Sequence, residues 1–301
     1  MNFLERALDK TNHFGNYVWM LVIIFGTGLM IGIPISIVKR MQESNGFISQ
    51  NIDVLLMLIP FAVILFACIW CVKHLHSRTF SETVNGTKKV RWGRAFMGFG
   101  VWFLLMLIYL LVDVAINPDN FTFQFDIKSF LPLLLIALFF IPLQATSEEF
   151  LFRGYLAQGI AVLTKNRWLV VIIPGILFGL VHFANPEISE YGFWVVMPDY
   201  IIIGLLFGLI SVLDDGIELL IGMHAANNIC GCLFVTFDAD VLSSPALFYQ
   251  HELSIGVDTI SMTVAGIIAI IFFARKYKWD FRVMNKKVEP LPIVEVRSEI
   301  E

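Results

Sequence analysis

The 301-residue chain is too apolar to be an ordinary soluble protein. Hydrophobic residues make up 57% of it and charged residues 15%, its mean hydropathy is +0.77 and its formal net charge is -4. Soluble domains carry about 25% charged residues, and this balance excludes a disordered tail, a collagen, a disulfide scaffold and a nucleic-acid binder. The apolar residues gather in blocks of roughly 20, the length that crosses a bilayer as a helix. Residues 1–274 are therefore predicted to form one polytopic, all-α integral membrane domain.

Hydropathy along the chain predicts eight membrane-spanning helices. They are expected at residues 16–38, 54–72, 95–117, 129–146, 168–185, 198–213, 216–236 and 258–274. In the fourth, apolar residues continue past Glu148 to about residue 163, so this segment is either one long helix or a broken pair. Residues 275–301 are basic at first and acidic later, which indicates a cytosolic tail without chemistry of its own.

The positions of the basic residues favour one orientation in the membrane. With the amino terminus in the cytosol, eighteen of the 21 lysines and arginines lie on the cytosolic side, and only Lys39, Arg40 and Lys128 lie on the other. Cytosolic loops are the ones enriched in Lys and Arg. Both termini are therefore predicted to be cytosolic, and the compact chain favours a bacterial plasma membrane.

Cysteines and glycines in the apolar segments are predicted to serve packing. Cys68 and Cys71 form one pair and Cys230 and Cys232 another, which would suit a zinc site. No basic residue lies beside them to favour the metal-binding thiolate, so we expect buried, inert thiols. Small-residue spacing that allows helices to approach closely occurs at Gly26, Gly28, Gly32, Gly204 and Gly208.

Two adjacent carboxylates and an arginine interrupt the fourth apolar segment: Glu148, Glu149 and Arg153. A charge at membrane depth is costly unless it is paired or hydrated, so such residues are functional-site candidates. Glu149 and Arg153 are four residues apart, the helical spacing at which an ion pair closes. Glu148 turns toward a different neighbour and is free for proton transfer. A purely structural cluster would explain only one of the two glutamates.

Two histidines lie in later apolar segments. His182 ends the sequence Phe-Gly-Leu-Val-His, and His224 is followed four residues later by Asn228. A single histidine in an apolar helix is commonly a satisfied core residue. Asn228, however, is costly to bury without a hydrogen-bonding task, and it shares a helix face with His224.

Helical rise places these groups at similar depths. Glu148 and His182 each lie about 17 residues, or roughly 25 Å, from the polar turn at Lys165, and His224 lies about 15 Å beyond Asp214. A projection of this turn by about 10 Å into the cytosol would bring all three into one layer. We therefore expect a water-accessible cavity in the cytosolic half of the protein.

The ordered motifs Glu-Glu-x-x-x-Arg, Phe-x-x-x-His and His-x-x-x-Asn resemble those of the CAAX prenyl endopeptidase and bacteriocin-processing (CPBP, ABI) family of intramembrane proteases. The resemblance covers residues 130–235. It implies hydrolysis of a peptide bond near the cytosolic membrane face, in a membrane-associated or lipidated peptide or protein. By motif position, Glu148 activates water and His182 assists it. His224 and Asn228 stabilise the oxyanion, and Glu149 and Arg153 support them.

Metal dependence stays open at the level of sequence. Glu148, His182 and His224 could ligate zinc and leave an open water position, but the His-Glu-x-x-His spacing is absent. We favour the metal-free mechanism. Two other functions are possible: a non-catalytic membrane binder of the same fold, such as a bacteriocin immunity or scaffold factor, and a small transporter that relays protons through its buried acids.

Overall fold

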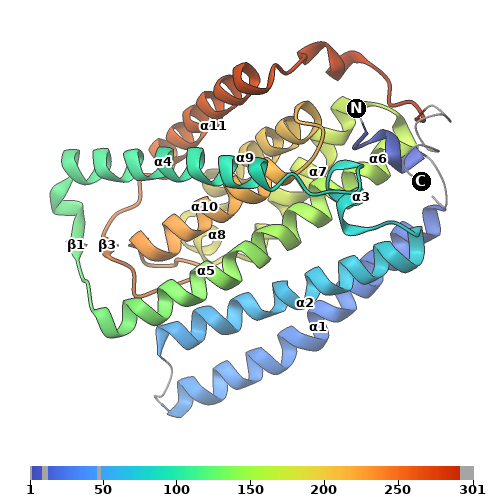
Figure 1. Cartoon of the computed structure of the whole chain (residues 1–301). Helices are drawn as coiled ribbons and strands as arrows, with labels where there is room; N and C mark the ends of the chain where they lie inside the picture. The colour runs from blue at the N-terminus through green and yellow to red at the C-terminus, as the bar shows by residue number, and fades with distance from the viewer. Residues whose placement is uncertain (1, 9–12, 46–48, 292–301) are drawn as a thin grey trace.

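The computed structural model describes residues 2–8, 13–45 and 49–291. It confirms an all-α membrane architecture, with seven helical segments in this part of the chain long and apolar enough to cross a membrane (Figure 1). Their helices are α1 (Phe14–Asn45), α2 (Gln50–His76), α4 (Trp92–Ile116), α5 (Ile127–Glu149), α7 (Arg167–Val181), α9 (Phe193–Leu213) and α11 (Ile255–Tyr277).

The eighth predicted span, 216–236, is the shorter helix α10 (Glu218–Phe234). Its 17 residues rise about 26 Å, close to the roughly 30 Å of a hydrocarbon core. Most of its side chains are buried, and it packs mainly against α4 and α5. The all-α prediction of about eight membrane helices therefore agrees with the structure: seven helical segments of the described chain are long and apolar enough to cross a membrane, and the shorter, more buried α10 packs among them.

The fourth segment is one long helix. Residues Ile127–Thr164 continue without a break through α5, a π-helical segment η3 (Phe150–Leu156) and α6 (Ala157–Thr164). A π-helical turn inside an α-helix commonly marks a functional site. This one begins directly after Glu149.

The helices pack as a bundle with two distinct ends (Figure 1). One end, here called the sheet end, carries the small sheet with strand order β1-β3-β2, in which β1 is antiparallel and β2 parallel to β3. The other, here called the basic end, carries η1, α3, α6 and the end of α11. The short elements are η1 (Glu5–Leu8), α3 (Phe80–Asn85), η2 (Pro118–Asn120), β1 (Phe121–Phe123), η4 (His182–Ala184), α8 (Pro186–Tyr191), β2 (Val235–Thr236), β3 (Phe248–Gln250) and η5 (Phe281–Asn285).

Glycines bring α7 and α9 into close contact. A Cβ on Gly204 would lie 2.3 Å from the carbonyl oxygen of Gly175, and one on Gly208 would lie 3.1 Å from that of Val171. The prediction for these two α9 glycines is confirmed. It was wrong for three glycines of α1, where a Cβ would meet nothing within 4 Å or only a side chain at 3.9 Å: Gly26, Gly28 and Gly32. The four cysteines are buried and free, as expected for packing thiols.

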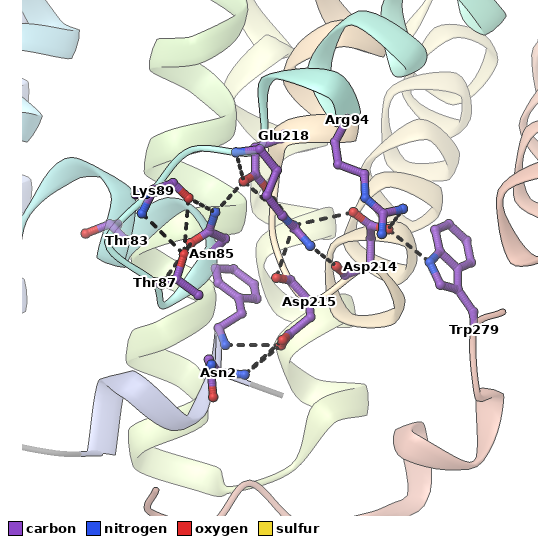
Figure 2. Close-up of polar contacts among 12 residues, drawn as sticks. Asn2, Thr83, Asn85, Thr87, Lys89, Arg94, Asp214, Asp215, Glu218 and Trp279 are labelled. Carbon is purple, nitrogen blue, oxygen red and sulfur yellow. Dashed lines mark hydrogen bonds and ion pairs between the residues drawn. The ribbon is translucent and has the colours of Figure 1, made fainter. Parts of the chain in front are cut away.

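A charged cluster at the basic end fixes the start of α10 (Figure 2). Glu218 Oε1 accepts hydrogen bonds from the backbone N and Nε of Arg91, both at 3.0 Å, and from the Asn85 amide. Asp214 pairs with Arg94 at 2.9 Å and accepts from Trp279 Nε1 at 3.0 Å. Burial raises the pKa of the Asp214 carboxyl to about 6, against the opposing pull of the two arginines. The cluster ties the α9–α10 turn to the neighbouring elements and so sets the height of α10.

Candidate active site

Two carboxylates end α5 in different surroundings. Glu149 is fully buried, whereas 13% of the Glu148 side chain is exposed. Successive residues on a helix point about 100° apart, so the pair faces two different neighbours. This separation is the one that the sequence predicted.

Glu149 is held by two cationic or donor groups. Arg153 Nη1 lies 2.9 Å from Glu149 Oε1, which confirms the predicted ion pair. His224 Nδ1 lies 2.7 Å from the same oxygen, and Nδ1 must be the donor because a carboxylate accepts. The guanidinium of Arg153 also lies 4.0 Å above the centre of the Phe178 ring and donates to Gly204 O at 3.3 Å. Glu149 therefore joins α5 to α10, and Arg153 joins it to α7 and α9.

Glu148 has one engaged oxygen and one free oxygen. Its Oε1 accepts a hydrogen bond from Gln144 Nε2 at 2.9 Å. Its Oε2 is buried and makes no hydrogen bond to the described residues. His224 Nε2 lies 3.6 Å from this oxygen, beyond direct hydrogen-bond distance. The free oxygen and the second nitrogen of His224 thus face the same small space.

A chain of hydrogen bonds leads to Glu148 from two other helices. Trp102 Nε1 donates to Asn227 Oδ1 at 3.2 Å, and Asn227 Nδ2 donates to Asn228 Oδ1 at 3.1 Å. Asn228 Nδ2 then donates to Gln144 Oε1 at 2.9 Å, and Gln144 donates to Glu148. Every amide in this chain is oriented by its neighbour, so the free Glu148 oxygen has a defined direction.

Three further residues of this chain of hydrogen bonds were not predicted from the sequence: Gln144, Asn227 and Trp102. Gln144 lies four residues before Glu148 on the same face of an apolar helix, a spacing that indicates a hydrogen-bonding role just as the spacing of His224 and Asn228 does. Asn227 and Trp102 gave no such signal, because their roles depend on the contact between α4 and α10. Asn228 keeps one amide hydrogen beyond its bond to Gln144, so its role as an oxyanion donor stays a prediction.

His182 lies beside the carboxylate cluster without joining it. Its Nδ1 is 2.7 Å from Phe178 O, and its ring stacks on Tyr200 with the centroids 4.3 Å apart. Among the residues that the structure describes, no hydrogen bond or ion pair joins His182 to Glu148 or His224. The Phe178 ring contacts both histidines, with centroid distances of 4.7 Å to His182 and 6.0 Å to His224.

The zinc hypothesis does not fit this arrangement of side chains. Across the described parts of the chain, no three His, Cys, Asp or Glu side chains gather closely enough to hold a metal ion. The postulated ligands Glu148 and His224 face each other, but His182 is engaged with Phe178 and Tyr200. We therefore assign no chemical step to a metal.

A cavity lies beside this region, toward the sheet end of the bundle. It has a volume of about 300 Å³ and is lined by Tyr200 and Asn227 together with residues of β1 and β3 at the sheet end. The water-accessible cavity predicted around Glu148, His182 and His224 stays a prediction, because none of these three residues lines the cavity described here.

Comparisons with known proteins test the family predicted from the motifs. A family model described as "Type II CAAX prenyl endopeptidase Rce1-like" matches residues 129–230, which contain all three motifs. The chain is also 31% identical over 261 residues to "Uncharacterized protein YyaK" of Bacillus subtilis (strain 168), an alignment that covers 82% of this chain and 87% of the relative. The chain belongs to the Rce1-like CAAX protease family.

This membership confirms the resemblance and its extent. The match to the Rce1-like model begins and ends within five residues of the predicted 130–235. It includes Glu148, Glu149, Arg153, His182 and Asn228. No solved structure matches the chain. Because the Bacillus relative is itself uncharacterised, the family establishes a class of CAAX-type endopeptidases, and the activity of this chain is a separate question.

Proposed function

We propose that this protein is an intramembrane endopeptidase that hydrolyses a peptide bond with water activated by Glu148. The observation that carries the proposal is the free, buried Glu148 Oε2, which faces His224 Nε2 across 3.6 Å. A buried carboxylate oxygen without a hydrogen-bond donor lowers the stability of the fold. Its presence here therefore indicates a functional role. A water bound beside these two atoms would supply that partner.

The first step is addition of water to the substrate carbonyl. Glu148 takes a proton from the water, and the water oxygen forms a bond to the carbonyl carbon, which leaves a negative charge on the former carbonyl oxygen. Gln144 holds the other Glu148 oxygen at 2.9 Å, so the base stays pointed at the water during the transfer.

His224 and Asn228 are proposed to stabilise the oxyanion. Nδ1 of His224 donates to Glu149, so Nε2 donates as well when the ring is an imidazolium. In that state the positive charges of Arg153 and His224 balance the two glutamates. Asn228 offers its second amide hydrogen from one turn further along α10. Donors fixed in advance stabilise the developing charge without reorganisation.

Collapse of the tetrahedral intermediate completes the reaction. The carbon–nitrogen bond breaks, and the proton held by Glu148 moves to the leaving amine nitrogen, which regenerates the carboxylate. The products are one new carboxyl terminus and one new amino terminus. His182, stacked on Tyr200 beside the site, is proposed to orient the substrate or the water.

The substrate is proposed to be a membrane-associated or lipidated peptide or protein. Seven helical segments long and apolar enough to cross a membrane support a site within the bilayer, in what we propose to be a bacterial plasma-membrane protein. Such a site reaches substrates that are held in or against the same membrane.

Comparative proteomics of cells that carry the wild type or Glu148→Gln tests the function and identifies the substrate. We expect a new peptide terminus only with the wild type, at equal levels of both proteins. Glu190→Gln is the matched control, because it removes a carboxylate that is exposed, in α8, whereas the Glu148 side chain is mostly buried. Identical termini in all three strains would instead support a non-catalytic binder of the same fold.

A further inference from the structure

A basic segment follows the last membrane helix and crosses the basic end of the bundle. Between residues 275 and 291 the chain carries six lysines or arginines and two acids, Asp280 and Glu289, which leaves a net charge of +4. Figure 1 shows this segment running from the end of α11 toward α6. All six of its basic residues are exposed: Arg275, Lys276, Lys278, Arg282, Lys286 and Lys287.

The inner face of this segment is apolar. Residues 275–288, here called the C-terminal strap, comprise the last turn of α11 and the chain that follows it. Val283, Met284 and Val288 of the strap are buried in the main hydrophobic core of the protein. These side chains hold the strap against the bundle, so its basic side chains form one outward surface.

Hydrogen bonds join the far end of the strap to the turn between α6 and α7. The backbone N of Val288 donates to Lys165 O at 3.0 Å, and Trp168 Nε1 donates to Asn285 Oδ1 at 3.1 Å. The strap is therefore an ordered part of the fold. A ligand bound to its outer face would stabilise the α6–α7 hairpin as well.

Aromatic residues around the strap indicate that it lies at the level of the lipid headgroups. Tyr277 and Trp279 lie where α11 ends, and Trp168 lies in the first turn of α7. Tyrosine and tryptophan are enriched at membrane–water interfaces, where the ring meets apolar chains and the polar group meets water. Phe281 is 49% exposed and adds an apolar side chain next to Arg282. The 23 residues of α11 rise about 35 Å, enough to bring the strap to the membrane surface.

The positive charges of the strap are not neutralised within the described protein. Asp280 lies 3.9 Å from Lys286, but the two side chains are 57% and 66% exposed, and pairs of this kind contribute little. The Asp280 carboxylate also accepts a hydrogen bond from the backbone N of Arg282 at 3.0 Å. The other five basic side chains make no ion pair with the described residues. A surface of this kind attracts a negatively charged partner.

We propose that the outer face of the C-terminal strap binds the headgroups of anionic phospholipids at the membrane surface. Each Lys or Arg next to an anionic membrane raises the affinity about fivefold, so several together select anionic over zwitterionic lipid. A lipid suits this surface better than a free anion, because the aromatic side chains contact acyl chains while the basic ones meet the headgroup. The site is separate from Glu148 and does not depend on the peptidase reaction.

Soluble short-chain lipids test the proposal on the whole protein in an uncharged detergent. The probe is dihexanoyl phosphatidylglycerol, compared with dihexanoyl phosphatidylcholine, inorganic phosphate and a polyglutamate peptide. An environment-sensitive fluorophore on Glu289→Cys reports binding, because this exposed position directly follows the buried Val288. Gly256→Cys is the matched label position: it is exposed, a Cβ there meets nothing within 4 Å, and it lies in the first turn of α11, at the other end. The four native cysteines are buried.

Phosphatidylglycerol should change the fluorescence at Glu289→Cys and not at Gly256→Cys. Its Kd should be at least about tenfold lower than that of phosphatidylcholine, and phosphate at the same ionic strength should give no saturable change. Equal binding of the two lipids would overturn the proposal. Phosphate or polyglutamate that binds as tightly as phosphatidylglycerol would also overturn it, because the surface would then recognise anions or acidic peptides in general.

Two adjacent lysines of the strap have a matched pair elsewhere at the basic end. Lys286→Gln/Lys287→Gln removes two exposed charges from the strap and should raise the Kd of phosphatidylglycerol by at least about tenfold. Lys88→Gln/Lys89→Gln removes two exposed charges from the segment before α4 and should leave that Kd unchanged. Equal weakening by the two double variants would contradict a site on the strap, because the preference would then come from the total charge of this end.

Thermal unfolding in nanodiscs tests the same site in a bilayer. The wild type should unfold several degrees higher with phosphatidylglycerol than with phosphatidylcholine alone, and the difference should disappear at about 1 M salt, where charges are screened within about 3 Å. Lys286→Gln/Lys287→Gln should lose most of the gain and Lys88→Gln/Lys89→Gln should keep it. The same unfolding temperature of the wild type in both lipids at low salt would contradict the proposal and leave the peptidase function standing.

Discussion

Removing Arg153 should destabilise the fold, because the residue neutralises a carboxylate that has no access to solvent. Arg153 is 1% exposed and Glu149 is fully buried, and their charged atoms lie 2.9 Å apart. Arg153→Met keeps most of the side-chain volume over the Phe178 ring but leaves Glu149 without its cation. Any loss of stability in Arg153→Met therefore comes mainly from the missing positive charge and not from lost packing.

The expected cost is about 3 kcal/mol. Breaking one half of a buried pair costs roughly 3–5 kcal/mol, and Glu149 keeps its 2.7 Å contact with His224, which favours the lower value. The double variant Glu149→Gln/Arg153→Met removes both charges and keeps an acceptor for His224. A pair replaced by neutral groups is often nearly neutral in stability, so we expect a coupling energy of at least about 2 kcal/mol between the two substitutions.

The assay is thermal unfolding of the three variants and the wild type in one detergent, together with the folded yield by size-exclusion chromatography. Arg153→Met should unfold several degrees lower and give less folded protein, and the double variant should recover most of the loss. If Arg153→Met unfolds at the wild-type temperature, or if the two substitutions add without coupling, the buried pair does not have the role assigned to it here.

Three further predictions concern the site and its anchor. Gln144→Leu should lower kcat by about tenfold or more with normal folded yield, because Glu148 loses the donor that orients it. Unchanged kcat would contradict that role. Asn228→Ala should lower kcat by about 100-fold with little change in KM, as expected of an oxyanion donor; a change in KM alone would assign it to substrate binding. Asp214→Asn should stabilise the protein at pH 7.5 and less so at pH 5. The Asp214 carboxyl has a pKa of about 6 in the folded protein, above its value in the unfolded chain. Its ionisation therefore lowers the free energy of unfolding as pH rises, by about 3 kcal/mol at full ionisation. Thermal unfolding at the two pH values checks this, and a larger gain at pH 5 would refute it.

Local features of the site could be predicted from the sequence because they depend on helix geometry. The spacing of Glu149 and Arg153 implies an ion pair on any regular helix, and the structure contains that pair. The three motifs could be recognised in the sequence because each is a short local spacing, and together they indicated the family. The division between the buried Glu149 and the less buried Glu148 follows from their different directions on α5.

Features that depend on packing could not be predicted in this way. The depths of the hairpin around Lys165 and of the turn after Asp214 depend on how the helices pack, so helical rise alone cannot locate the cavity that the sequence predicts around Glu148. Burial of α10 within the bundle also has no signal in hydropathy, because a helix surrounded by other helices is as apolar as one surrounded by lipid. The chain from Trp102 to Glu148 needs three helices in contact before any of its bonds can form.

The most direct test of the central claim is the effect of Glu148→Gln on cleavage of the substrate found by proteomics. Purified wild type, Glu148→Gln and Glu190→Gln would be compared in the same proteoliposomes, with folded fraction and substrate binding measured in parallel. Loss of the general base should lower kcat/KM by at least about 100-fold, with folding and binding retained and Glu190→Gln fully active. Cleavage by folded Glu148→Gln at the wild-type rate would contradict the claim that Glu148 activates the water.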